Sequence, residues 1–173
     1  TAPEGTVHLW NVGPIQGTDL KNKLLSTGVL PGFVAGNAEY TIGEPASGNG
    51  NIAVAAHTTR VKYQNILGQT VTIGAETNGA IADFTSHGPT IDGRMRPHLS
   101  GPGHSVCSAI SVFDSETANS VVLRTTEFNN QTYRYGCYSG TSMSSPMVAG
   151  IVALMLERNP TLTFQEVLEI LEA

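Results

Sequence analysis

The amino-acid sequence predicts a protein of the α/β class, on three observations. Residues 147–156 form an apolar run with apolar side chains on every side and small residues as spacers, which is typical of a buried helix. Residues 52–56 are apolar without alternation, as expected for a strand covered on both faces. After a break at Asn159 and Pro160, Thr163 and Glu166 have the spacing of a capping box, which predicts a second helix.

The remaining elements are expected to be short strands and turns. Residues 7–12 alternate as a strand does. Residues 61–66 and 70–74 predict a hairpin. Residues 104–110 predict a strand and residues 132–138 its return, and the long polar connection between them has room for a further pair of strands.

Composition and charge exclude several classes of protein. A length of 173 residues, with 40% hydrophobic and 13% charged residues, suits one globular, turn-rich domain. The net charge of −5 and the lack of a basic run argue against nucleic acid as a partner. The longest apolar stretch is too short to span a bilayer.

The chain opens at Thr1 with neither an initiator Met nor a signal peptide, so we expect the start of a fragment or of a processed segment. The two cysteines lack metal-site spacing, which predicts no zinc site.

The most informative stretch is residues 140–146, Gly-Thr-Ser-Met-Ser-Ser-Pro. Pro146 suits the first turn of a helix, where its missing N–H is not needed. Ser142 is therefore expected at or just before a helix N-terminus, where free N–H groups and the helix dipole favour negative charge. Two roles suit that place: N-capping, and nucleophilic attack that creates an oxyanion. Spacing alone favours capping.

Residues 140–146, followed by Met-Val-Ala-Gly, closely resemble the signature around the nucleophilic serine of subtilisin-like serine peptidases. Met147 stands where the best-known members have His, at a position on the helix. The resemblance implies that Ser142 is the nucleophile of a serine endopeptidase, which hydrolyses peptide bonds through an acyl-enzyme.

The resemblance is continuous over residues 41–173. Gly-Glu-Pro-Ala at residues 43–46 resembles a family step before a buried core strand. This implies that Gly43 borders the pocket for the side chain before the scissile bond, and that Glu44 contributes to its charge. The implied fold is the C-terminal part of a subtilisin-like α/β domain, with a mostly parallel sheet and flanking helices.

Residues 1–40 do not share this clear resemblance, and we expect an insertion or an accessory β-rich segment there. Asn37 follows an Ala-Gly step, as the oxyanion-hole Asn of the family does, although the apolar run before it is short. Two interpretations stay open: Asn37 is that residue, or it is a turn Asn and the oxyanion Asn lies upstream of Thr1.

The catalytic Asp and His of the family are not found in their motifs. The aspartates lack an apolar strand context and the histidines lack a His-Gly-x-His-like setting; these are Asp19, Asp83, Asp92, Asp114, His8, His57, His87, His98 and His104. In well-studied members, loss of the histidine alone costs about 10⁶-fold in rate. We therefore expect this polypeptide alone to hydrolyse almost nothing.

Three explanations compete. In the first, the chain is the nucleophile-bearing part of a larger active endopeptidase, whose partners are the missing N-terminal half of the catalytic domain and a protein or peptide substrate. In the second, it belongs to a degenerate subtilisin-like domain that serves as a binding or scaffold module. In the third, residues 1–40 are an interaction module whose binding role dominates. The intact signature at residues 140–146 argues against the second.

Further expectations come from the family alone. They are no cofactor in this segment, calcium in the full-length protein, and an extracellular or periplasmic location. The strands at residues 104–110 and 132–138 form a hairpin in the family, which would put Cys107 and Cys137 opposite each other. A disulfide and two buried free thiols both fit that placement.

Overall fold

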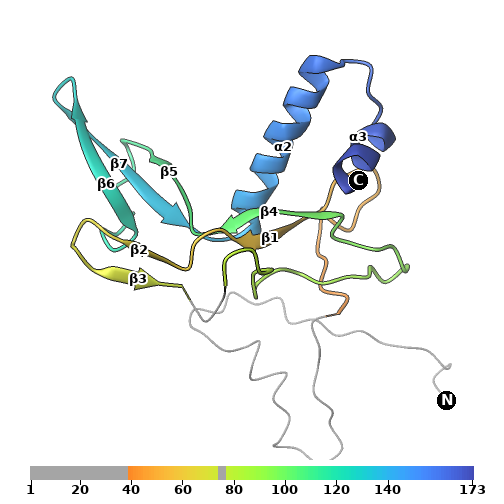
Figure 1. Ribbon diagram of the computed structural model, residues 1–173, viewed down its shortest axis with the longest axis horizontal. Coiled ribbons are helices and arrows are strands. Elements are labelled where there is room, and N and C mark those ends of the chain that lie inside the picture. Colours follow the sequence, from red (N-terminus) through yellow and green to blue (C-terminus); the bar gives the residue numbers. More distant parts are fainter. Residues whose placement is uncertain (1–38, 74–76) are drawn as a thin grey trace, which may run out of the picture.

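A computed structural model describes residues 39–73 and 77–173. At its centre, strand β1 (Val54–Thr58) lies parallel to β4 (Leu99–His104), with Val54 opposite Leu99 (Figure 1). Ala55 and Ala56 of β1 are buried, as the unbroken apolar pattern predicted. The strand begins two residues later than expected, and Ala53 just before it is also buried. The sequence patterns predict no strand at residues 99–103, and pairing with β1 makes them part of β4.

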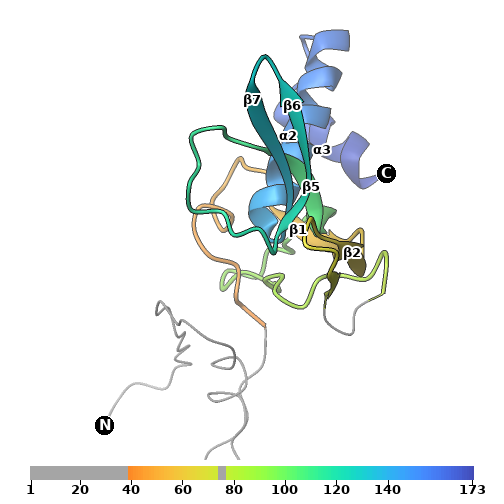
Figure 2. The same ribbon diagram turned by 90° about the vertical axis from the view of Figure 1, so that its left-hand side faces the viewer.

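Helix α2 (Thr141–Arg158) crosses this parallel pair near its own N-terminus (Figures 1 and 2). Ser144 is fully buried and Val148 is 3% exposed, both against β4. The close packing of α2 on β4 depends on the glycines of β4, because a Cβ on Gly103 would lie 2.1 Å from Ser144 Oγ. A Cβ on Gly101 would lie 3.3 Å from Val148 Cγ2. The N-terminal turns of α2 therefore rest directly on strand backbone.

The sequence predicted a buried helix at residues 147–156. The helix is present, but in the described part of the chain much of it is exposed, so the prediction of burial is wrong. Met147, Ile151 and Leu154 are 44%, 50% and 66% exposed. The reason is that β1 and β4 contact only one side of α2, near its start. Pro146 also lies inside α2 and not in its first turn. Proline has no N–H to donate to the carbonyl four residues earlier, which is that of Ser142.

The segment before α2 forms a three-stranded antiparallel sheet. Strand β7 (Gln131–Tyr138) lies between β5 (Val106–Ile110) and β6 (Val122–Phe128). The β5–β7 pairing confirms the predicted return strand, and the connection, which has room for a pair of strands, holds one, β6. In Figure 1 the β6–β7 hairpin and α2 extend from the β1–β4 pair in different directions.

Cys107 and Cys137 lie opposite each other in the β5–β7 ladder and form a disulfide. The structure thus takes the bridged alternative of the two that the sequence left open. The bridge links residues 30 positions apart. It fixes β5 to β7 shortly before β7 leads into α2.

Two local predictions are confirmed. Strand β2 (Lys62–Gln64) pairs with β3 (Thr70–Thr72) as an antiparallel hairpin. Helix α3 (Phe164–Glu172) begins with the capping box, in which the Thr163 hydroxyl accepts from the Glu166 N–H and the Glu166 carboxylate accepts from the Thr163 N–H.

The mixture of helices and small sheets agrees with part of a subtilisin-like α/β domain. The described strand pairs include one parallel and three antiparallel pairs, so the mostly parallel sheet stays a prediction.

Candidate active site

Ser142 is the second residue of α2 and is exposed. The N-cap of the helix is Gly140, with a φ of 150° that suits glycine, and no side chain caps this helix terminus in the described part of the chain. Ser142 is therefore not the N-cap, and the capping role is wrong for it. Its hydroxyl stands where the first N–H groups of the helix lack intrahelical partners and the helix dipole is positive.

The two residues before the helix are tied to the end of β4. The Gly140 N–H donates to the Gly103 carbonyl over 2.7 Å. The Ser105 N–H donates to Ser139 Oγ over 3.0 Å. These bonds join segments more than thirty residues apart in sequence, since the Ser105–Ser139 separation is 34. They fix the entry of the chain into α2, and hence the position of Ser142.

A cavity of about 660 Å³ opens beside Ser142. This volume is typical of small-ligand sites and is ample for an amino-acid side chain. One wall comes from the start of α2 and the rest from loop segments and the approach to β1. The lining residues are Ile42, Gly43, Glu44, Pro45, Ala46, Asn51, Ile52, Ala53, Val54, Thr85, Ser86, Pro97, Thr141, Ser142 and Ser145.

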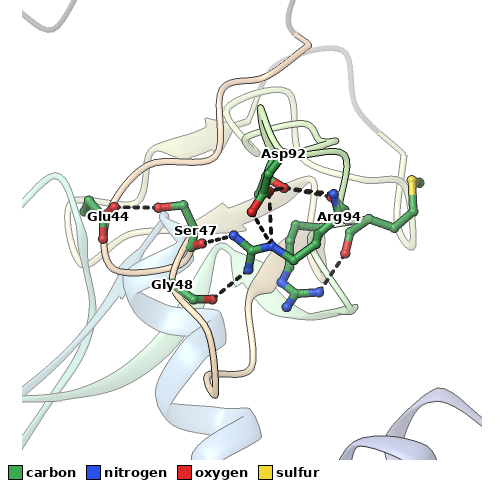
Figure 3. A network of polar contacts seen from close by, with 8 residues as sticks. Glu44, Ser47, Gly48, Asp92 and Arg94 are labelled. Carbon is green, nitrogen blue, oxygen red and sulfur yellow. Dashed lines mark hydrogen bonds and ion pairs between the residues drawn. The ribbon is translucent and has the colours of Figure 1, made fainter.

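The structure brings Gly43 and Glu44 to the wall of the same cavity as Ser142, and Glu44 is the charged residue among those that line it. The Ser47 hydroxyl donates to Glu44 Oε1 over 2.8 Å (Figure 3). The Asn51 amide donates to the Pro45 carbonyl, while its own Oδ1 is buried without a hydrogen-bond partner in the described part of the chain. The roles of Gly43 and Glu44 in specificity stay predictions.

The four histidines within residues 39–73 and 77–173 do not line this cavity. His57 Nδ1 lies 3.2 Å from Ser100 Oγ, and His98 Nδ1 accepts from the Ala53 N–H over 2.9 Å. Burial, helped by the positive charge of Arg96, lowers the pKa of His98. His87 is exposed, and the ring of His104 packs edge-on against Phe84. None of the four is held beside Ser142. This agrees with the interpretation that none of them is the catalytic base, and that interpretation stays a prediction.

The described aspartates are also engaged elsewhere. Hydrogen bonds from the Thr90 hydroxyl and from Arg94 hold the pKa of Asp92 below its usual value. The Thr117 hydroxyl does the same to the pKa of Asp114. Asp83 is exposed and does not line the cavity. His8, Asp19 and Asn37 lie outside the described residues.

Within residues 39–73 and 77–173, no group of three or more His, Cys, Asp or Glu side chains could hold a metal ion. Neither described helix is long and apolar enough to cross a membrane.

Ser142 is an exposed serine at the start of a helix that packs on a parallel strand pair, and it lies beside a cavity ample for a side chain. These features define a candidate serine-hydrolase site in an α/β protein. Comparison with known proteins gives the family. The model of the subtilase family matches residues 11–172, and the chain belongs to that family of serine peptidases. The match begins upstream of residue 41 and includes Asn37, so the boundary at residue 41 and the role of Asn37 stay predictions.

Several curated relatives are similar to this chain. The serine protease AprX of Bacillus subtilis is 36% identical over 92 residues, 53% of this chain and 20% of the relative. The minor extracellular protease Vpr of the same organism is 31% identical over 98 residues, 56% of this chain and 10% of the relative. Subtilisin E, also from Bacillus subtilis, is 30% identical over 165 residues, 93% of this chain and 33% of the relative. The chain thus spans a third or less of the length of these relatives, and no solved structure matches it.

Sequence reasoning missed two residues that shape the cavity. The sequence patterns assign no role to either Asn51 or Arg94. Both act on carbonyl groups of the segment at residues 43–48. The Arg94 contact joins residues 46 and 47 positions apart, and no spacing signal in a single sequence reveals such a contact.

Proposed function

We propose that the full-length protein is a serine endopeptidase and that Ser142 is its nucleophile. The observation that carries the proposal is the exposed Ser142 at the start of α2, in the lining of the cavity, in a chain of the subtilase family. Ser142 Oγ attacks the carbonyl carbon of the scissile peptide, and the amine leaves as the acyl-enzyme forms. Water then hydrolyses the acyl-enzyme. The Ser142 N–H, at the positive end of α2, helps to stabilise the oxyanion of each step.

The proton of Ser142 needs a base, which we assign to a histidine outside residues 39–73 and 77–173. The proposal is supported by the engagement of the described histidines away from the cavity. The orienting aspartate and the rest of the cleft come from the missing N-terminal half of the catalytic domain on this view. It follows that the isolated chain hydrolyses almost nothing, because loss of the histidine costs about 10⁶-fold in subtilisin.

The substrate is a protein or peptide, and the location is extracellular or periplasmic. Support for the location is that one relative is named as an extracellular protease. Calcium, where the full-length protein binds it, takes ligands from outside the described residues, which is consistent with the lack of a suitable side-chain cluster in the described part.

The test is covalent labelling with a fluorophosphonate probe on the full-length protein and on this chain. Ser142→Ala should abolish labelling, because the probe reacts with an activated serine. Ser108→Ala, an exposed serine on β5, is the matched control and should keep wild-type labelling. A full-length protein that is folded, free of any propeptide and still unlabelled would favour the degenerate binding module. Labelling of the isolated chain would mean that one of its own histidines acts as the base.

A further inference from the structure

One wall of the cavity beside Ser142 includes residues 43–46, which belong to a turn at residues 43–48. Its own hydrogen bonds are local: the Ser47 N–H donates to the Gly43 carbonyl over 3.0 Å, and the Gly48 N–H to the Pro45 carbonyl over 3.0 Å. Gly43 and Glu44 are exposed. A turn held only by such bonds would be free to move relative to α2, where Ser142 lies.

Arg94 supplies a contact from a distant segment. Its Nη1 donates to the Gly48 carbonyl over 3.0 Å and its Nη2 to the Ser47 carbonyl over 2.6 Å (Figure 3). Its side chain is 29% exposed, so these bonds are partly shielded from water. Two donors of one planar guanidinium thus hold two successive carbonyl groups, an arrangement that a lysine cannot reproduce.

Asp92 fixes the guanidinium from the other side. Arg94 Nε lies 3.1 Å from Asp92 Oδ1 and 2.9 Å from Oδ2. The Arg94 N–H donates to Thr90 Oγ1 over 3.0 Å, and the Thr90 hydroxyl donates to Asp92. Gly93, with a φ of 83°, allows the tight turn that brings Asp92 and Arg94 together. The arginine is therefore pre-oriented before it meets the turn at residues 43–48.

The network ends at the cavity wall. Ser47, whose carbonyl accepts from Arg94, donates its hydroxyl to the carboxylate of Glu44. Glu44 lines the cavity with Ser142, while Asp92 and Arg94 do not. A change at Asp92 or Arg94 therefore reaches the Glu44 side of the cavity through the turn that they hold.

We propose that Asp92 and Arg94 are positioning residues for substrate binding: they fix the turn at residues 43–48, and with it the cavity wall that receives a substrate side chain beside Ser142. The proposal rests on the proposed peptidase function and adds residues to it. The pair contacts neither the nucleophile nor the reacting atoms. Its loss should therefore weaken binding of an extended peptide more than it slows chemistry at Ser142.

The experiment uses the full-length protein with Arg94→Gln, Arg94→Lys and Asp92→Asn. Arg124→Gln is the matched control, since Arg124 is an exposed arginine on β6 outside the network. We expect Arg94→Gln to raise KM for a peptide amide substrate about tenfold, because substrate binding must then order the turn that Arg94 no longer holds, with kcat changed less than about twofold. Arg94→Lys should recover only part of this loss, and Arg124→Gln should match the wild type.

A fluorophosphonate probe, too small to need the cavity wall, should label all four variants at the wild-type rate. Unchanged KM in Arg94→Gln, or a lowered melting temperature with unchanged KM well below that temperature, would overturn the positioning role while leaving the function intact. An unlabelled wild type would overturn the function and the positioning role with it. If neither arginine variant folds, Asp92→Asn keeps the arginine and decides by the same KM measurement.

Discussion

Replacing Gly103 by alanine should displace the start of α2 and the serine on it. The added Cβ would lie 2.1 Å from Ser144 Oγ and 2.4 Å from Ala56 Cβ, against normal contacts of about 3.5–4.0 Å. Ala56 belongs to the central strand pair and Ser144 is fully buried, so neither neighbour has room to turn aside. The helix must therefore move by roughly 1–2 Å, the difference between these distances.

The expected cost of this overpacking is about 1–3 kcal/mol of unfolding free energy. For a domain of this size, each kcal/mol lowers the melting temperature by about 2–4 °C. A shift of about 1 Å or more at Ser142 should also slow fluorophosphonate labelling of the full-length protein by about 10²-fold. Both quantities are measured on the same sample, by thermal unfolding and by the labelling rate.

The matched control is Gly150→Ala, a substitution on α2 itself. A Cβ at Gly150 meets no atom within 4 Å, so it should gain about 1 kcal/mol from helix propensity and leave labelling unchanged. The reasoning about Gly103 fails if Gly103→Ala keeps both the wild-type melting temperature and the wild-type labelling rate. Strain of the backbone cannot explain a loss, because Gly103 does not have a positive φ that excludes alanine.

Three further predictions concern stability. Ser144→Ala should raise the unfolding free energy by about 1 kcal/mol, because the buried hydroxyl has no hydrogen-bond partner among the described residues; a loss in chemical denaturation would contradict this. Reduction of the Cys107–Cys137 bridge should lower the unfolding free energy by about 3 kcal/mol, since the bridge closes a loop of 30 residues; equal melting temperatures with and without reductant would refute it. The pKa values of Asp92 and Asp114 are lowered in the fold, so their stabilisation is present above their ordinary value of 3.8 and is lost as the pH falls through the lower folded pKa. Denaturation measured from pH 5 to about pH 2 should show this loss, and Asp92→Asn should make the profile shallower.

Elements that depend on neighbouring residues were predictable from the sequence. The capping box of α3 needs only a hydroxyl and a carboxylate three residues apart, and the structure has it. The β2–β3 hairpin and the β7 return strand also follow local patterns. The start of α2 near Ser142 was predicted from Pro146, and the prediction holds although Pro146 lies inside the helix and not in its first turn.

Features that depend on distant segments were not predictable in the same way. Residues 99–103 contain two glycines and a proline and have weak strand propensity, and they become β4 because β1 supplies the ladder. The apolar run in α2 cannot reveal which side of the helix is covered, because burial is a property of what packs on it. For the candidate site, the family resemblance pointed to Ser142 and Gly43, which line one cavity and whose roles stay predictions, whereas Arg94 holds the turn at residues 43–48 through contacts 46 and 47 residues away.

The parallel pairing of β1 with β4 has a consequence for the time course of folding. Val54 and Leu99 must meet before the pair exists, and the Gly103–Gly140 bond that fixes the helix start needs the pair first. Such long-range closures are slow, whereas α3 and the β6–β7 hairpin can form within microseconds from local contacts. In the full-length protein, circular dichroism should therefore recover early during refolding, and labelling of Ser142 should return last. A labelled Ser142 then reports that the β1–β4 core has assembled.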